Sequence, residues 1–463
     1  MEKIVSLCKR RGFIFPGSEI YGGLANSWDY GPLGVELKNN IKQLWWDRFV
    51  RQRDDIVGID TALIMNPKIW EASGHTKTFS DLLSECVSCH HRVRVDHYLK
   101  PKEQTELNEK WKKSESDPKG LLSLQKEIQK TLNEKAACPQ CGKKEWSAPK
   151  PFNLMLSTTL GATESGDKVY LRPETAQGMF VNFKNVLETM RPTLPFGIAQ
   201  IGKAFRNEIT PGNFVFRTRE FEQMEIEYFV REKEWNTYFE HWLKEFRDWF
   251  EEIGLPQKLV HEVEVPEADR AFYSKRSVDF EFDFPFGQRE LYGLAYRADY
   301  DLKNHETASG VNLKYRDPET KEEFWPHVIE PTWGVGRSVL ALLTAAYSEE
   351  GDRTVLKLKP KLAPYKAAVF PLLANKPELI KKAKDVYQLL ITNNQLLPIA
   401  WDDRGNIGKR YYSQDEIGTP FCITIDFDSL EKDDVTVRDR DTMKQERIKI
   451  NELQQYLHGK IYC

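Results

Sequence analysis

Apolar and polar positions alternate along residues 204–230 and predict a long antiparallel hairpin. Its two β-rich runs are joined by the turn-rich residues 210–213, Thr-Pro-Gly-Asn. The second run has a mostly apolar face and an acidic or amide-bearing face. The latter carries Phe221, Gln223, Glu225 and Glu227. The pattern fits equally a solvated hairpin with scattered charges and a surface that holds a small zwitterion beside a polyphosphate.

The same periodicities predict elements before and after this hairpin. A helix over residues 35–53 has apolar side chains at helical spacing, and a strand follows over residues 59–64. Strict alternation over residues 280–284 predicts another strand, which turns into a second strand that bears Glu290. An apolar helix follows Arg337 and is expected to be buried.

Strands and helices alternate through the C-terminal hundred residues, which predicts a separate small α/β domain over 361–463. The expected strands are 367–372, 397–402, 420–426 and two around 438–441, and the expected helices are 377–392, 408–416 and one from Asn451. Basic side chains near a glycine-containing loop, Arg404, Lys409 and Arg410, fit phosphate contacts and a solvated loop equally well.

Composition limits the class of protein. With 463 residues, two or three domains are expected. Lys and Arg number 67 against 70 Asp and Glu, so a nucleic-acid surface would have to be a local basic patch. Apolar runs stay well short of the roughly 20 residues of a membrane span, and the N-terminal residues lack the apolar stretch of a secretory signal. We therefore expect a cytoplasmic protein without a membrane partner.

Four of the seven cysteines form two CxxC pairs within residues 84–148. These cysteines are Cys86, Cys89, Cys138 and Cys141. Two such pairs are typical of four thiolates around one structural Zn²⁺, and the adjacent His90 and His91 are then bystanders. The intervening residues 101–137 are rich in Lys, Glu and Gln and predict one or two solvated helices. We expect 84–148 to form an insertion in a domain made of 1–83 and 149–360.

The hairpin resembles the second signature motif of class II aminoacyl-tRNA synthetases. FRNE at 205–208 and FRTREFEQME at 216–225 carry the resemblance, in the wording of homodimeric glycyl-tRNA synthetases. Further similar segments occur in the same order along the chain: RGFIFPGSEIYGGLANSWDYGPLGVELKNNIKQLWW, NPKIWEASGH, YLRPETAQGMF, FGQRELYGLAYRADYDLKNH and HVIEPTWGVGRSVLALL. The resemblance implies an α+β fold: a class II antiparallel sheet flanked by helices, with a zinc-knuckle and helical insertion and a C-terminal anticodon-binding domain.

The resemblance also implies an ATP site. Arg206 would contact the α-phosphate, the loop with Arg217 and Arg219 would close over the outer phosphates, and Phe221 would stack on adenine. The implied catalytic residues are Arg206, Glu290 and Arg337. The implied ATP-binding residues are Arg206, Asn207, Glu208, Phe216, Arg217, Thr218, Arg219, Glu220, Phe221, Glu290, Leu291, Gly334, Val335, Gly336 and Arg337.

A glycine site is implied beside the ATP site. Glu174 would engage the ammonium group, although Pro-Glu at the start of a helix is also locally favourable. Arg94 lies in RVRVDH, which resembles the family's R-A-D with valine in place of alanine. The implied glycine-binding residues are Arg94, Glu174, Phe221, Glu222, Gln223, Met224, Glu225, Glu330, Pro331, Thr332, Trp333 and Gly334.

By resemblance, the reaction is the ATP-dependent attachment of glycine to tRNA(Gly) through glycyl-adenylate. Mg²⁺ bound beside the phosphates, structural Zn²⁺ and a homodimer are expected with it. Two other functions are alternatives: that of another class IIa synthetase, such as a prolyl or threonyl enzyme, and that of a non-catalytic nucleic-acid-binding relative. The first would need a pocket for a side chain, and the second would be expected to have lost Arg206, Glu290 or Arg337.

Overall fold

The computed structural model describes residues 1–463 except 100–102, 104–105, 108–109, 112–113, 115–116, 163–165, 210–211, 393–397 and 463. The first half of the predicted 210–213 turn, the first residue of the predicted strand 397–402 and parts of the predicted helical segment 101–137 lie outside the described residues.

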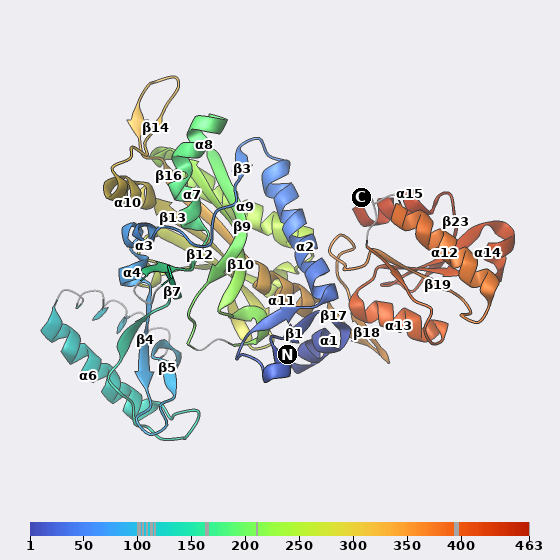
Figure 1. Cartoon of the computed structure of the whole chain (residues 1–463), viewed down its shortest axis with the longest axis horizontal. Coiled ribbons are helices and arrows are strands. Elements are labelled where there is room, and N and C mark those ends of the chain that lie inside the picture. Colours follow the sequence, from blue (N-terminus) through green and yellow to red (C-terminus); the bar gives the residue numbers. More distant parts are fainter. Residues whose placement is uncertain are drawn as a thin grey trace.

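A seven-stranded sheet organises the larger part of the chain (Figure 1), in the order β11-β12-β13-β16-β10-β9-β3. Neighbouring strands are antiparallel except β3 and β9. The strands are β3 (Ile56–Gly58), β9 (Phe196–Phe205), β10 (Glu220–Val230), β11 (Val260–Glu264), β12 (Arg276–Phe284), β13 (Gly287–Ala298) and β16 (His327–Gly334).

The predicted hairpin is confirmed as β9 and β10. Their register runs without interruption from Glu220 opposite Phe205 to Phe229 opposite Phe196. The predicted strand at 280–284 lies within β12, and Glu290 lies on β13 as expected.

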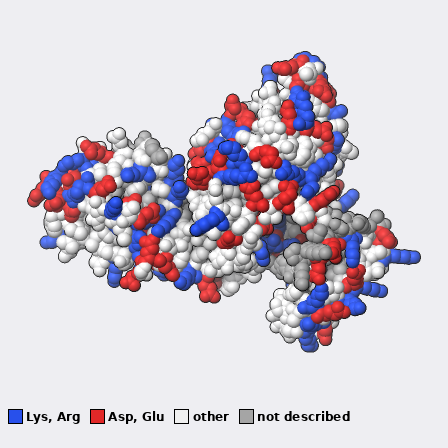
Figure 2. Space-filling model, turned by 180° about the vertical axis from the view of Figure 1, so that it is seen from behind, with Lys and Arg blue, Asp and Glu red and all other residues white. Residues whose placement is uncertain are grey.

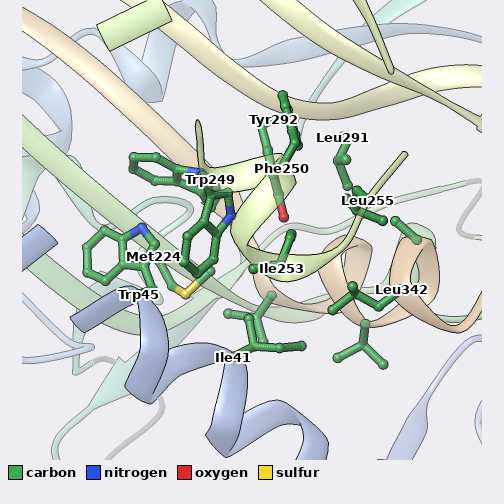
Figure 3. Packing of buried hydrophobic residues seen from close by; sticks show 14 of the residues in the cluster. Ile41, Trp45, Met224, Trp249, Phe250, Ile253, Leu255, Leu291, Tyr292 and Leu342 are labelled. Carbon is green, nitrogen blue, oxygen red and sulfur yellow. The ribbon is translucent and has the colours of Figure 1, made fainter. Parts of the chain in front are cut away.

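One face of this sheet packs against three helices, α2 (Pro32–Trp46), α9 (Trp235–Ile253) and α11 (Val335–Ala346). Buried side chains from the helices and strands interlock there, as Figure 3 shows for Trp45, Met224, Trp249 and Tyr292. At the centre lies Trp333, whose ring is 4.6 Å from that of Phe246 and 5.4 Å from that of Trp45. Burial of these large rings is the main stabilising contribution at this interface.

The opposite face is partly covered by α7 (Ala176–Val181), α8 (Phe183–Met190) and α10 (Tyr300–Ser309), which form a second cluster with Phe196 and Phe229. Because side chains alternate along a strand, the odd-numbered polar residues of β10 point toward this second face. The second face is therefore where a polar site can form.

Two predictions near the N-terminus have different outcomes. The helix expected over 35–53 is confirmed as α2, continued by a π-helical segment at Asp47–Arg51. The strand expected over 59–64 is wrong: β3 occupies Ile56–Gly58, and Ile64 makes only an isolated bridge. The chain leaves the sheet because the carbonyl of Thr61 accepts from the buried Arg172 guanidinium, at 2.8 Å, instead of from a neighbouring strand.

Smaller elements surround the sheet. They are α1 (Glu2–Arg11), β1 (Ile14–Pro16), β2 (Trp28–Tyr30), α3 (Pro67–Ala72), α4 (His75–Thr78), β7 (Ser157–Leu160), β8 (Asp167–Tyr170), β14 (Tyr315–Arg316), β15 (Glu323–Phe324), β17 (Tyr347–Glu350) and β18 (Arg353–Leu356).

The cysteine-bearing insertion has its own sheet and core. Its strands β4 (Ser80–Glu85), β5 (Arg92–Arg94) and β6 (Lys150–Asn153) pair in the order β5-β4-β6, beside the helix α6 (Pro118–Lys135). Trp146 and the α6 residues Leu124, Ile128 and Leu132 fill a separate apolar cluster. This sheet reaches beyond the predicted bounds of 84–148 at both ends.

The C-terminal part is an α/β domain with its own hydrophobic cluster, at the right of Figure 1. Its strands are β19 (Ala367–Pro371), β20 (Ile399–Trp401), β21 (Phe421–Ile425), β22 (Asp434–Asp439) and β23 (Gln445–Lys449), in the order β20-β19-β21-β22-β23. Its helices are α12 (Pro377–Thr392), α13 (Ile407–Ile417), α14 (Phe427–Lys432) and α15 (Leu453–Tyr462). The predicted alternation is confirmed, except that α14 was missed and 440–442 form the turn between β22 and β23.

Charge is mixed over the molecule. On the side shown in Figure 2, basic and acidic side chains are interspersed across the surface of all parts. Among the described residues, none of the helices is long and apolar enough to cross a membrane.

Candidate active site

A cavity of about 460 Å³ opens on the polar face of the central sheet. Its floor comes from β10, β12, β13 and β16, and the insertion contributes Asp81 and Arg94 to its wall. Arginines gather at one end of the cavity and buried carboxylates at the other.

Arg206, just after β9, is held between two aromatic rings. Its guanidinium carbon lies 5.2 Å from the ring centre of Phe79 and 5.3 Å from that of Phe221, and its Nε donates to the carbonyl of Pro173 at 3.1 Å. Two cation–π contacts and one backbone acceptor restrict the side chain. Its Nη groups have no hydrogen-bond acceptor among the described residues and can bind an anion.

Two further arginines stand nearby. Arg217 lies 3.8 Å from the carboxylate of Glu208, and burial lowers the pKa of Arg217 despite that opposite charge. Arg337, at the start of α11, pairs with Glu290 at 3.0 Å and lies over the ring of Phe216 at 4.6 Å. A polyphosphate would satisfy these cations.

Glu290 is the acidic residue closest to this arginine group. Burial alone would raise the pKa of Glu290, but Arg337 more than offsets it and holds that pKa below its usual value. On the adjacent strand, burial and the charge of Glu290 raise the pKa of Asp279 to about 7. These carboxylate oxygens are the hard ligands that Mg²⁺ accepts beside nucleotide phosphates, so the residues present fit such an ion.

Glu174 is buried at the other end, beside α7. Gln177 Nε2 donates to its Oε1 at 3.0 Å, and His75 Nε2 lies 3.2 Å from its Oε2. Burial would raise the pKa of Glu174, but His75 and then Arg297 hold it well below its usual value. Glu174 is therefore ionised in this pocket.

Two more buried carboxylates converge on this end. Glu225 accepts hydrogen bonds from the hydroxyls of Thr175 and Thr332, the latter at 2.9 Å. Glu330 accepts from Arg297 Nη1 at 2.5 Å, yet burial raises its pKa to about 8. Because buried negative charge exceeds the positive charge that faces it, this end favours an ammonium ion.

Outside the cavity lining, the four predicted cysteines come together. Their sulfur atoms all lie within 4.8 Å of one another, with Cys86 Sγ 3.6 Å from Cys141 Sγ and Cys89 Sγ 3.5 Å from Cys138 Sγ. None of the four is in a disulfide. Backbone turns close both pairs, since His90 N donates to Cys86 O at 2.9 Å and Gly142 N donates to Cys138 O at 2.8 Å. This donor set fits a tetrahedral Zn²⁺.

Comparison with known proteins agrees with this arrangement. Residues 158–346 match the model for the tRNA synthetase class II core domain (G, H, P, S and T), and residues 366–460 match the model for an anticodon binding domain.

Relatives that match over their full length indicate the family more narrowly than the two domain models do. The glycine–tRNA ligase of Alkaliphilus oremlandii is 50% identical over 469 residues, which cover 100% of this chain and 98% of the relative. The glycine–tRNA ligase of Lachnospira eligens is 52% identical, over 99% of this chain and 98% of the relative. The glycine–tRNA ligase of Geobacillus thermodenitrificans is 50% identical, over 100% of this chain and 97% of the relative. The chain belongs to the glycine–tRNA ligase family. The resemblance and the α+β class II fold expected from the sequence are thereby confirmed.

Most residues implied by this glycine–tRNA ligase resemblance line the cavity. These are Arg94, Glu174, Arg206, Glu208, Phe216, Arg217, Thr218, Phe221, Glu222, Gln223, Glu225, Glu290, Leu291, Glu330, Thr332, Gly334, Gly336 and Arg337. Glu222 reaches the wall, but its carboxylate is turned to Lys38 and Lys42, at 2.7 and 3.1 Å.

Seven implied residues do not line the cavity: Asn207, Arg219, Glu220, Met224, Pro331, Trp333 and Val335. Met224, Trp333 and Val335 belong to the core on the opposite face, so their side chains lie away from the cavity. Glu220 pairs with Lys203, and Arg219 donates to the carbonyls of Glu208 and Ala25, each at 3.2 Å. The assignment of these seven residues to the substrate sites stays a prediction.

Sequence reasoning also missed several residues of the site. Phe79, Asp81, Tyr273 and Asp279 line the cavity, and Arg297 organises its acidic end. The segment YRADYDL contained a usable signal, because Arg297 and Asp301 stand four apart and pair at 2.8 Å. Phe79, Asp81 and Tyr273 come from segments whose approach to the sheet only the tertiary structure determines.

Proposed function

We propose that this chain activates glycine with ATP, forming glycyl-adenylate and pyrophosphate, and then transfers glycine to the 3′ end of tRNA(Gly). The observation that carries this proposal is the polarity of one cavity, with arginines at one end and buried carboxylates at the other. A triphosphate and an ammonium group fit these two ends and bring the substrate carboxylate between them.

The first step needs no protein nucleophile, because the carboxylate of glycine attacks the α-phosphorus. Arg206 would hold the α-phosphate, and its contacts with two aromatic rings support this role. Arg337 would hold the outer phosphates. Both cations stabilise the charge that develops on the phosphoryl oxygens and on the leaving pyrophosphate.

Mg²⁺ would be held by Glu290 and by the phosphates of ATP, and it would neutralise phosphate charge there. The side chain of Phe221 faces the same end and offers a ring on which adenine can stack. The proposal thus assigns parts of the family's reaction to individual residues of this chain.

Selection of glycine is proposed to be steric. Glu174 and Glu225 would bind the ammonium group, and Thr332 both donates to Glu225 and narrows the wall with its methyl group. Glycine offers no side chain to bind, so larger amino acids must be excluded by lack of space.

The insertion is proposed to hold a structural Zn²⁺ through Cys86, Cys89, Cys138 and Cys141. Their clustered sulfur atoms and the two backbone turns support this. The ion would crosslink the two chain segments that carry these cysteine pairs.

We also propose a cytoplasmic homodimer with three parts: a catalytic domain (1–83 and 149–360), the insertion (84–148) and an anticodon-binding domain (361–463). Separate hydrophobic clusters support three parts, and the sheet of the insertion extends that part to Ser80 and Asn153. Light scattering at micromolar concentration should give twice the chain mass of 54.0 kDa, and a mass of one chain would contradict the dimer.

Exchange of labelled pyrophosphate into ATP, without tRNA, tests the activation step. Glycine alone should support exchange, whereas proline, threonine, serine and alanine should not. Exchange with a larger amino acid would contradict the steric proposal. Absence of exchange with every amino acid, from folded protein that contains metal, would contradict the enzymatic function itself.

A further inference from the structure

A carboxylate in the middle of β10 has no hydrogen-bond partner in the part of the chain that the structure describes. Glu227 is 0% exposed, and both of its carboxylate oxygens lack a partner among the described residues. A buried carboxylate left in this state is costly if it is charged, because it has lost its hydration without compensation.

Strand register places a second glutamate directly opposite. On β10 and β16, Glu225 faces Thr332 and Tyr228 faces Ile329, so Glu227 faces Glu330. The ladder is interrupted beside this pair, where Pro331 has no N–H to donate. The carboxylate oxygens of Glu225, Glu227 and Glu330 lie within 4.8 Å of one another. Like charges at directly opposite positions destabilise a sheet.

The nearby polar groups are engaged elsewhere. On β13, Arg297 donates two hydrogen bonds to Asp301 on α10, from Nε and Nη2, both at 2.8 Å. Its Nη1 donates to Glu330 at 2.5 Å. On β10 itself, Glu225 is satisfied by two threonine hydroxyls. Glu227 is thus the member of this cluster without a counter-charge of its own.

We propose that Glu227 is held as a neutral, protonated acid and is a positioning residue: its proton removes one negative charge from the Glu227 and Glu330 pair, so that Glu330 keeps its hydrogen bond from Arg297. Two carboxylates so close in a buried site cannot both be ionised without a cation between them. The link to the glycine pocket rests on the proposed function, whereas the protonation of Glu227 does not.

The electrostatics of the cluster agree with the geometry. Burial first, and then the charge of Glu330, raise the pKa of Glu227 well above its usual value, against the opposing effect of Arg297. Glu225 and Asp301 raise it further. Burial and the neighbouring carboxylates of Glu330, Glu225 and Asp301 therefore outweigh Arg297 and disfavour the ionised form of Glu227.

Infrared spectroscopy tests the proposal directly, through the difference between the spectra of wild type and of each variant. A protonated carboxylic acid has a carbonyl stretch that an ionised carboxylate lacks. At pH 7, wild type should show this band and Glu227→Gln should lose part of it. Glu222→Gln is the matched control, because it changes a glutamate of the same strand that is paired with two lysines, and it should keep the full band. An unchanged band in Glu227→Gln would mean an ionised Glu227, with or without a bound cation, and would overturn the proposal.

Stability as a function of pH gives a second readout. When folding raises the pKa of an acid, the unfolded state loses its proton at a lower pH than the folded state. The free energy of unfolding therefore falls as pH rises above the pKa of the unfolded state. The folding equilibrium constant of Glu227→Gln relative to wild type should therefore grow, by up to about tenfold per pH unit from about pH 5 upward. The corresponding ratio for Glu222→Gln should not grow.

A Glu227→Gln protein that fails to fold would count against the proposal, since glutamine is a neutral isostere of the protonated acid. A ratio that is constant or falls with pH would overturn it as well. Neither measurement uses an amino-acid substrate, so both are independent of pyrophosphate exchange.

Discussion

At the scale of single residues, the cavity is built from side chains whose freedom is removed by their neighbours. Phe79 and Phe221 enclose the Arg206 guanidinium, and Glu290 orients Arg337. Such groups can stabilise developing charge without the free-energy cost of reorienting their side chains during the reaction.

Replacing Arg206 by alanine should slow glycine-dependent pyrophosphate exchange by about 10²- to 10³-fold, because one preorganised cation at the reacting phosphate is lost. Arg206→Lys should recover only part of the rate, since lysine keeps the charge and loses the planar fork. Arg404→Ala, which changes a side chain that is 86% exposed, is the control and should leave exchange unchanged. A near-normal rate in Arg206→Ala would remove its assigned role.

At the scale of elements, β10 serves two environments at once. Its odd-numbered residues Phe221, Gln223 and Glu225 line the cavity. Its even-numbered residues Met224, Ile226 and Tyr228 lie in the core beneath α9. Glu222 is the polar exception on the core side, where Lys38 and Lys42 of α2 take its carboxylate. This pairing ties the helix to the edge of the site.

Glu222→Gln should lower the free energy of unfolding at pH 7 by about 1 kcal/mol. Burial would raise the pKa of Glu222, but the two lysines hold it below its usual value of 4.5. The stabilisation is therefore present above that value and is lost as pH falls through the folded pKa. Urea denaturation at pH 7 and pH 4 should show the difference from wild type shrinking toward pH 4.

Glu188→Gln, in which the side chain is 64% exposed, is the control for this pair and should unfold like wild type at both pH values. A Glu222→Gln difference that stays constant between pH 7 and pH 4 would show that the lysines do not cause it.

The insertion makes its own prediction at this scale. Elemental analysis should find about one zinc per chain, and Cys138→Ser should lose the metal and make α6 sensitive to protease, because the ion joins two knuckles. Cys422→Ala, which changes a buried cysteine of the C-terminal domain, should keep the metal. Wild type purified without chelator and free of metal would contradict the site.

At the scale of the whole molecule, a buried ionic network joins the C-terminal domain to the catalytic domain. Asp415 on α13 is 0% exposed and accepts from Arg353 of β18 at 3.1 Å and from Arg438 of β22 at 2.9 and 3.0 Å. Arg440 extends the network by donating to the carbonyl of Leu358 at 2.8 Å. The two domains are thus held by directional bonds between charged groups.

Asp415→Ala should destabilise the protein by about 3–5 kcal/mol, since it leaves two buried guanidinium groups without their carboxylate. Calorimetry should show the C-terminal domain unfolding at a lower temperature. Asp433→Asn, in which the side chain is 72% exposed, is the control and should unfold like wild type. Equal transition temperatures for wild type and Asp415→Ala would show that the network does not hold the domains together.

Periodicity predicted the elements that are long or regular, including β10, α2 and the alternation of the C-terminal domain. It failed at 59–64, where an apolar run resembles a strand but Arg172 takes the carbonyl of Thr61. A local sequence pattern cannot show that Arg172 will take this carbonyl in place of a neighbouring strand, because Arg172 lies more than a hundred positions away. The same reason explains the missed Phe79 and Tyr273.

The sequence by itself determined the family, the two faces of β10 and the pairing of four cysteines, because each depends on residue type and short spacing. Only the tertiary structure decided which side chains reach the cavity. Trp333 stands one position from Thr332, yet the pleat sends it into the core and leaves Thr332 at the cavity wall. The opposition of Glu227 and Glu330 also belongs to the fold, since strand register brings together residues that are distant in the chain.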